Sequence, residues 1–435
     1  MPPSHANIIT IVLAGIVATW VANDTVLTKW MLPITSASTP TILLKRPAHQ
    51  IPPALWQLKL APTATTKTIT GPLNATQIAS YYDDGFLILP NFFDSYLPSL
   101  QSDVEQLIDH LATDLYAAGH VKSTYAQASW TERLLRLTED YPNAPLVLIK
   151  GGVLPTNFQH LYSDSDMLDI ANQLGVGPDV AVNAAWNLRA KMKKHEETTV
   201  PWHQDNSYWE PRVWDEHVIT VWVSLVDARI ENGCMQFVQG GHKTGKTASH
   251  TIGTTTKTWY TELDEKTMEH DLLDQGINLA SRIVTAEVPA GTAIIFPGIT
   301  PHRSLNSISD KIRWSTDYRL HRRVAARQGF SSSPLDWFYG LKDSLLLRDG
   351  KGDASDYVAD WSSWANVERT KIQDEGLGTE ETAEKFDPVI CGPWMDLWNL
   401  TTHIDGESNN QHVDRYLSSA AGKRPAGEGY LPDNW

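Results

Sequence analysis

The stretch from Pro201 to Asp205 holds residue types that could bind a metal ion. His203 and Asp205 are two positions apart, so in an extended strand their side chains would point to the same side and reach one ion. His302, which follows an apolar run and a Pro-Gly turn, is the best candidate for a third ligand. Two histidines and one carboxylate form the facial triad of non-haem Fe(II) oxygenases, which leaves the opposite positions open for O₂ and a co-substrate.

Arg313 adds a fixed positive charge to this set. It follows His302 in the strand-like segment 311–316. A guanidinium group there could hold a carboxylate by two parallel hydrogen bonds. A metal triad beside a carboxylate anchor indicates an enzyme.

Structural roles for such residues are also open. Arg313 could simply pair with Asp310 or Asp317. A second His-x-Asp pattern begins at His403, and a His-x-Glu pattern begins at His195. Neither lies in an alternating apolar strand with a suitably spaced His and Arg after it, so we interpret them as loop and surface residues.

The segments around the candidate ligands have the pattern of short strands. Residues 220–225 alternate, so Trp222 and Ser224 would share one face while the valines share the other. The strand-rich part begins near Val180, and glycine-containing turns separate its later strands. Short strands with such turns predict an all-β core, a sandwich or jelly roll, in place of a βαβ fold.

Helices are expected on the N-terminal side of this core. Asn74 or Thr76 could cap a helix that ends at Asp84, before a buried strand. Apolar periodicity predicts further helices at 94–111 and 130–137, with irregular chain from there to about 167.

The order of motifs resembles the phytanoyl-CoA dioxygenase family over roughly residues 72–325. The segments that carry the resemblance are, in order, WHQDNSYW, HVITVWVSLVDA, ENGCMQFV, QGGHK and PHRSLNSISDKIRW. QGGHK departs from the usual Pro-Gly-Ser-His form of the family, which we interpret as a turn variation. The resemblance implies a double-stranded β-helix, the cupin-like jelly roll, with N-terminal helices and a C-terminal extension (an α+β chain overall).

The resemblance also implies a set of cofactors and residue roles. His203, Asp205 and His302 would bind Fe(II), and 2-oxoglutarate would chelate the metal. Arg313 would hold its distal carboxylate, with Ser304 as a second donor and Trp222 beside the same pocket. O₂ would complete the reaction, and ascorbate is expected to stimulate it.

The function implied is hydroxylation of a C–H bond in a small lipid-like or secondary metabolite, with release of succinate and CO₂. Halogenating relatives lack the carboxylate that Asp205 supplies, so its presence favours hydroxylation. Desaturation, cyclisation or epoxidation on the same fold remains an alternative. So do a non-catalytic metal-binding sensor or scaffold and a zinc hydrolase, although neither would need Arg313.

The composition of the chain limits the classes of partner that it is expected to bind. A net charge of −15 argues against general affinity for nucleic acid or anionic membranes, and weakly against a polyanionic acyl-CoA substrate. Two cysteines, Cys234 and Cys391, cannot form a secreted disulfide framework. Nothing in the sequence indicates the oligomeric state.

The N-terminal region is a separate question. The apolar run 8–22 is shorter than the roughly 20 residues that span a bilayer, and no Lys or Arg precedes it. It could be a signal peptide, a short anchor or a buried amphipathic helix. The first two would place the protein in the secretory pathway or at a membrane, and the third in the cytoplasm. The predicted organisation is an apolar segment 1–32, a Pro/Thr-rich linker 33–71, a dioxygenase-like domain 72–325 and an extension 326–435 packed on the core.

Overall fold

The computed structural model describes residues 9–13, 16–20, 49–50, 71–150, 154–182, 187–209, 214, 216–252, 259–322, 345–350, 361, 386, 388–390 and 394–398. The chain divides into two units, residues 1–44 and 45–435. In the first, β1 (Ile9–Leu13) and β2 (Ile16–Trp20) pair antiparallel, so the helical interpretation of the apolar run was wrong. Among the described residues, no helix has the length and hydropathy needed to span a membrane.

Helices open the second unit, as predicted. Helix α2 (Ala75–Asp84) begins at Asn74, whose side chain accepts a hydrogen bond from the Gln77 amide, and it ends at Gly85 in the left-handed conformation. A 3₁₀ turn, η1 (Asp94–Tyr96), leads into α3 (Leu97–Ala117), which buries one apolar face. The capping residues and the apolar periodicity therefore predicted these two helices correctly.

The chain between 137 and 167 was predicted to be irregular, and that prediction was wrong. Helix α4 (Arg133–Asp140) corresponds to the helix predicted at 130–137, and α7 (Ser165–Gln173) begins where the irregular stretch was expected to end. Between them lie α5 (Ala144–Lys150) and α6 (Thr156–Tyr162), which were not predicted. Helices this short are unstable alone and show little periodicity, so packing decides them. Phe158 and Leu161, for example, are fully buried in the cluster that also contains the apolar face of α3.

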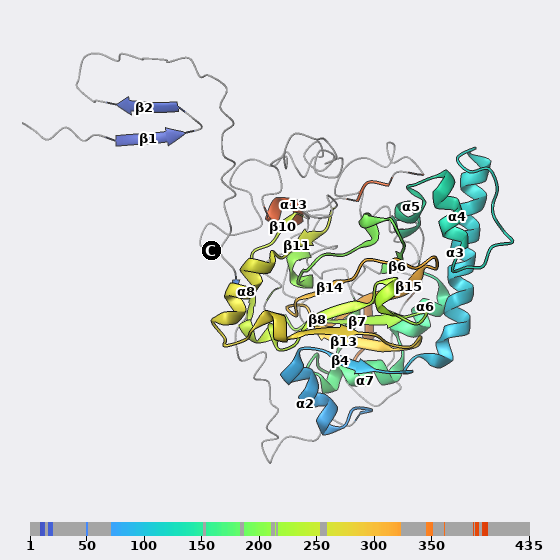
Figure 1. Ribbon diagram of the computed structural model, residues 1–435. Coiled ribbons are helices and arrows are strands. Elements are labelled where there is room, and N and C mark those ends of the chain that lie inside the picture. The colour runs from blue at the N-terminus through green and yellow to red at the C-terminus, as the bar shows by residue number, and fades with distance from the viewer. Residues whose placement is uncertain are drawn as a thin grey trace, which may run out of the picture. The chain divides into compact units, whose positions relative to one another are not determined.

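A seven-stranded antiparallel sheet forms the centre of the second unit (Figure 1). Its order is β16-β5-β15-β7-β13-β4, and β6 also pairs with β15. The strands are β4 (Leu87–Leu89), β5 (Val180–Val182), β6 (Asn187–Lys191), β7 (Ile219–Ser224), β13 (Ala293–Pro297), β15 (Arg313–Arg322) and β16 (Leu345–Arg348).

A second sheet lies against it, in the order β12 (Ile283–Ala286), β8 (Met235–Val238), β14 (His302–Ser304). An apolar layer that includes Trp222, Phe237 and Phe296 joins the two sheets. Val221 and Val223 belong to the other cluster, with the helices, so the alternation predicted for β7 is confirmed. The predicted jelly-roll core with flanking helices is therefore confirmed.

Smaller elements surround this core. They are β3 (His49–Gln50) paired with β9 (Lys246–Thr247), β10 (Thr251–Ile252) paired with β11 (Thr261–Glu262), the helix α8 (Glu265–Leu273), and the 3₁₀ turns η2 (Glu196–Thr198), η3 (Asp205–Tyr208), η5 (Ile230–Asn232), η6 (Gly241–Thr244) and η7 (Leu279–Ser281).

The described parts of the extension also contact the core. Strand β16 adds an edge to the main sheet, which the sequence did not predict. Near the end, the short helix α13 (Trp394–Leu397) and the following residue contribute two indole donors. Trp394 bonds the Trp259 carbonyl at 2.8 Å, and Trp398 bonds the Ser207 carbonyl at 2.7 Å. The domain boundaries themselves stay a prediction.

Candidate metal centre

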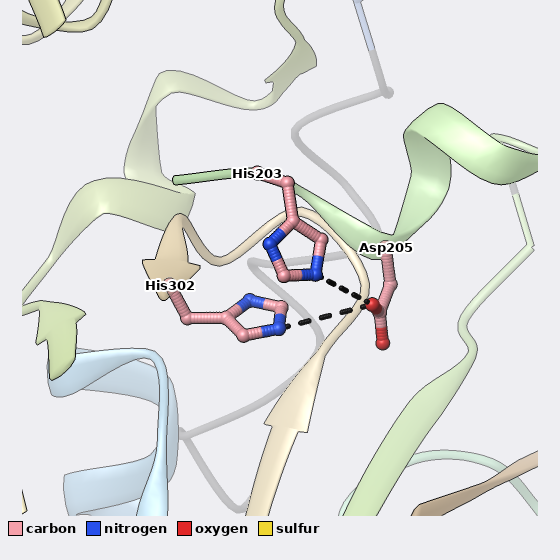
Figure 2. A group of neighbouring side chains, drawn as sticks. All are labelled: His203, Asp205 and His302. Atoms are coloured by element: carbon pink, nitrogen blue, oxygen red, sulfur yellow. Dashed lines mark ion pairs between the residues drawn. The ribbon is translucent and has the colours of Figure 1, made fainter. Parts of the chain in front are cut away.

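His203 and His302 come from distant parts of the chain and meet through their backbones. They form an isolated antiparallel bridge, in which each amide donates to the other carbonyl at 3.0 Å. Their ring centroids are 4.1 Å apart, and both side chains are buried. The pairing of two backbone segments thus brings two imidazoles side by side (Figure 2).

Each imidazole is oriented by the carbonyl two residues before it. His203 Nδ1 lies 2.8 Å from the Pro201 carbonyl, and His302 Nδ1 lies 2.9 Å from the Thr300 carbonyl. A carbonyl oxygen can only accept, so each Nδ1 carries the proton and each Nε2 keeps its lone pair. Both Nε2 atoms face Asp205, at 3.4 Å and 3.8 Å from Oδ1 (Figure 2).

The two carboxylate oxygens of Asp205 have different surroundings. Oδ2 accepts hydrogen bonds from the Thr220 hydroxyl and from the Arg319 guanidinium, the latter at 2.9 Å. Oδ1 is buried and has no hydrogen-bond partner among the residues that the structure describes. Burial alone raises the pKa of this carboxyl, but Arg319 and the two histidines outweigh it and hold the pKa well below its ordinary value.

The geometry fits a divalent metal ion. Ligand atoms of His203, Asp205 and His302 all lie within 4.8 Å of one another, and all three side chains are buried. Burial, followed by the neighbouring His203, lowers the pKa of His302 to about 3, so its imidazole is neutral near pH 7. The imidazoles of His203 and His302 and one ionised carboxylate oxygen of Asp205 are a suitable donor set for Fe(II).

The local backbone differs from the extended strand that the sequence suggested. His203 lies in a strand-like bridge, but Asp205 is the first residue of the 3₁₀ turn η3. The Asn206 amide bonds the Gly298 carbonyl at 3.0 Å, which ties this turn to the chain before His302. The two ligands therefore converge through a turn, although the spacing was interpreted through strand geometry.

Arg313 begins β15 in a cavity beside the triad, which Trp222 and Ser304 also line. Its Nη1 donates to Ser315 at 2.6 Å, and its guanidinium carbon lies 5.4 Å from the Trp222 ring centroid. Its Nε has no hydrogen-bond partner within the part of the chain that the structure describes. Burial, and then the charge of Arg189, lowers its pKa to about 10. Ser304 is already bonded, since its hydroxyl accepts from the Val200 amide at 3.1 Å. Five of the six predicted site residues thus line one cavity, and the sixth, Asp205, lies beside His203 and His302.

Several charged residues at this cavity were missed. Arg189, Asp317 and Arg319 all line it. Asp317 accepts hydrogen bonds from both arginines, at 2.8 Å from Arg189 Nε. Arg313 shares one face of β15 with Asp317 and Arg319, since they lie at alternate positions. Polar residues at every second position of 313–319 were the available signal.

The competing patterns at His195 and His403, and the alternative partner Asp310, can also be compared with the structure. His195 lies 2.9 Å from its neighbour Glu197, away from the triad. His403 and Asp405 lie outside the described residues. Asp310 pairs with Lys193 at 3.0 Å, so it does not neutralise Arg313.

Known proteins resemble this chain at two levels. The family model described as phytanoyl-CoA dioxygenase matches residues 81–315. "Phytanoyl-CoA dioxygenase domain-containing protein 1" of Bos taurus is 29% identical over 170 residues, which cover 39% of this chain and 52% of that protein. A Caenorhabditis briggsae homologue is 28% identical, with 28% of this chain and 39% of its own length covered. The chain thus spans 52% and 39% of the length of these two relatives. "Phytanoyl-CoA dioxygenase" of Arabidopsis thaliana is 23% identical, with 63% and 96% covered.

Solved structures are similar only in part. EvdO2 from Micromonospora carbonacea var. aurantiaca has a TM-score of 0.41 and 16% identity, and 58% of this chain and 93% of that chain are covered. EctD from S. alaskensis, solved with 2-oxoglutarate and 5-hydroxyectoine, has a TM-score of 0.39 and 19% identity, with 65% and 86% covered.

Proposed function

The chain belongs to the phytanoyl-CoA dioxygenase family, and we propose that it is a non-haem iron oxygenase that hydroxylates a small organic metabolite. The observation that carries the proposal is the convergence of His203 Nε2, His302 Nε2 and Asp205 Oδ1. Bound Fe(II) would supply the chemistry by which one oxygen atom of O₂ enters succinate, as 2-oxoglutarate loses CO₂, and the other enters a C–H bond of the substrate.

The protein's contribution is orientation and charge. The Pro201 and Thr300 carbonyls fix the imidazole tautomers, so that both histidines present lone pairs to the metal. Thr220 and Arg319 occupy one oxygen of Asp205, which leaves the other free to ligate. His203, His302 and Asp205 would supply three ligands to the metal, and its remaining positions would be available to 2-oxoglutarate and O₂.

Arg313 is the proposed anchor for the distal carboxylate of 2-oxoglutarate. Its unpartnered Nε lies in a buried site, where an ionised partner would relieve the cost of an uncompensated guanidinium. Ser304 can add a hydrogen bond, because its oxygen accepts from Val200 while its hydroxyl proton remains available. Trp222 forms a flat wall under the guanidinium.

The same cavity suggests the chemical class of the substrate. Its wall combines the buried Arg189–Asp317–Arg319 network with apolar side chains, Met235 and Phe296. Ligand sites of this kind use a few placed polar groups for orientation and apolar surface for contact. This supports a metabolite with polar groups on a hydrocarbon frame, and not a pure hydrocarbon.

The first test is turnover without a known substrate. Purified protein with Fe(II), ascorbate and 2-oxoglutarate should release succinate slowly, and His203→Ala should reduce the release to background. His195→Ala, which removes an imidazole outside the site, should behave like the wild type. Equal succinate release by the wild type and the His203→Ala variant would contradict the triad assignment.

Asp205→Ala tests the carboxylate. With candidate metabolites, hydroxylation should be abolished, because the remaining two histidines do not complete the triad. Mass spectrometry of the wild-type product then separates hydroxylation, which adds an oxygen atom, from desaturation, which removes two hydrogens. Full activity of the Asp205→Ala variant would rule out the proposed ligand set.

A further inference from the structure

Lys191 is the last residue of β6 and lies directly opposite Arg313 in the β6–β15 pairing. Its side chain is 1% exposed, and its Nζ has no hydrogen-bond partner among the described residues. Like charges at directly opposed positions of a sheet are destabilising, and a buried ammonium without a partner is more so. Two basic side chains are therefore held together, and the positive charge of Arg313 disfavours protonation of Lys191.

Both side chains face the cavity side of the sheet. Arg189, two residues before Lys191 on β6, lines the cavity together with Arg313, and side chains two apart on a strand share a face. The turn at Gly233 packs against the side chain of Lys191. A Cβ added to Gly233 would lie 2.9 Å from Lys191 Cε and 2.5 Å from the Leu305 carbonyl. The stem of Lys191 is thus fixed in place.

The charged groups around Lys191 include no free carboxylate in the described part of the chain. Asp317 is engaged by Arg189 and Arg319, and the Cys234 thiol has its pKa raised to about 11 by burial. Burial, then Arg313 and Arg189, lower the pKa of Lys191 well below its ordinary value. The missing counter-charge is therefore one that a ligand would supply.

We infer that Lys191 is a second cation of the co-substrate site and that it joins Arg313 in binding the distal carboxylate of 2-oxoglutarate. The inference rests on the proposed function and assigns a role to a residue beyond the anchor named there. An ammonium supplies three donors and a point charge, while the guanidinium supplies a planar fork. One carboxylate can pair with both, and its negative charge would favour the protonated form of Lys191 beside Arg313.

The experiment compares two ligands on protein loaded with Ni(II), by isothermal titration calorimetry. 2-Oxoglutarate and 2-oxopentanoate share the metal-chelating keto acid, but only the first has the distal carboxylate. Lys191→Met should weaken 2-oxoglutarate binding on the order of tenfold or more, without weakening 2-oxopentanoate binding. Lys193→Met, which removes a half-buried lysine two residues on that pairs with Asp310, should leave both affinities unchanged.

Proton uptake gives an independent readout. Titrations near pH 8 in buffers of different ionisation enthalpy should show wild-type protein taking up a proton with 2-oxoglutarate, because the carboxylate raises the lowered pKa of Lys191. Lys191→Met should lose this uptake. The variant should also be as stable as the wild type without ligand, or more stable, since it removes an unpaired buried amine.

Three results would overturn the inference. Unchanged 2-oxoglutarate affinity in Lys191→Met would show that the amine is not used, and equal weakening with both ligands would show a purely structural role. Wild-type protein that binds neither ligand would overturn the proposed function, and this inference with it. The first two results leave the proposed function standing.

Discussion

Thr220 is the neutral donor on Asp205. Its hydroxyl bonds the same oxygen that Arg319 holds, and the side chain is 1% exposed. Thr220→Val keeps the shape and removes that bond, so the carboxylate gains freedom to rotate. We expect metal affinity to fall about tenfold, the lower end of the usual effect of losing a residue that orients a ligand. Competition between the protein and a chelator for Ni(II) measures the change.

Thr220→Ser is the matched control for that variant. It keeps the hydroxyl and loses only a methyl group, so metal affinity should return to nearly the wild-type value. If valine and serine weaken metal binding equally, packing and not the hydrogen bond positions Asp205.

At the residue scale, the sequence predicted the site residues that belong to a short motif or follow it at a characteristic spacing. His203 and Asp205 are adjacent in a short motif, and His302 and Arg313 lie at suitable spacings after it. Arg319 was missed because its partner Asp205 is 114 residues away and the contact depends on β15 pairing in one register. Lys191 was also missed, because in the sequence it looks like its neighbour Lys193. Only the pairing of β6 with β15 places it opposite Arg313.

At the element scale, the contact between the segment around Trp398 and the site region was the least expected one. Its indole stacks on Trp214, with centroids 5.9 Å apart, and its N–H bonds the Ser207 carbonyl in the turn that begins at Asp205. Trp398→Ala should lower the free energy of unfolding by about 3 kcal/mol through loss of buried contact. Trp398→Phe should cost about 1 kcal/mol, since it mainly loses the hydrogen bond.

Urea unfolding, followed by tryptophan fluorescence and circular dichroism, measures both Trp398 variants. If alanine and phenylalanine leave stability unchanged, the terminal segment does not stabilise the core. Sequence alone could not predict this contact, because the residues around Trp398 lack periodicity and their partners Trp214 and Ser207 lie almost 200 positions earlier. The helices α5 and α6 were missed for a related reason, since seven residues carry too little pattern.

At the scale of the whole molecule, the jelly-roll core was predictable because strand alternation and turn residues agree along 180–316. The two faces of the main sheet have different roles. One face of the main sheet packs on helices, while the other meets the second sheet and carries the charged cavity. The buried charges thus sit where burial costs most, so ligands that bind them should stabilise the fold.

Metal-linked stability follows from that arrangement. Asp205 Oδ1 is buried without a partner, so the folded protein should bind a divalent ion far better than the unfolded chain does. Ni(II) at about 100 times its dissociation constant should raise the free energy of unfolding by about 2.7 kcal/mol. In His302→Gln, which removes one ligand and keeps a side chain of similar size, most of that increase should disappear. Urea titrations with and without Ni(II) give both values, and an equal increase in the variant would mean that the stabilising ion binds elsewhere.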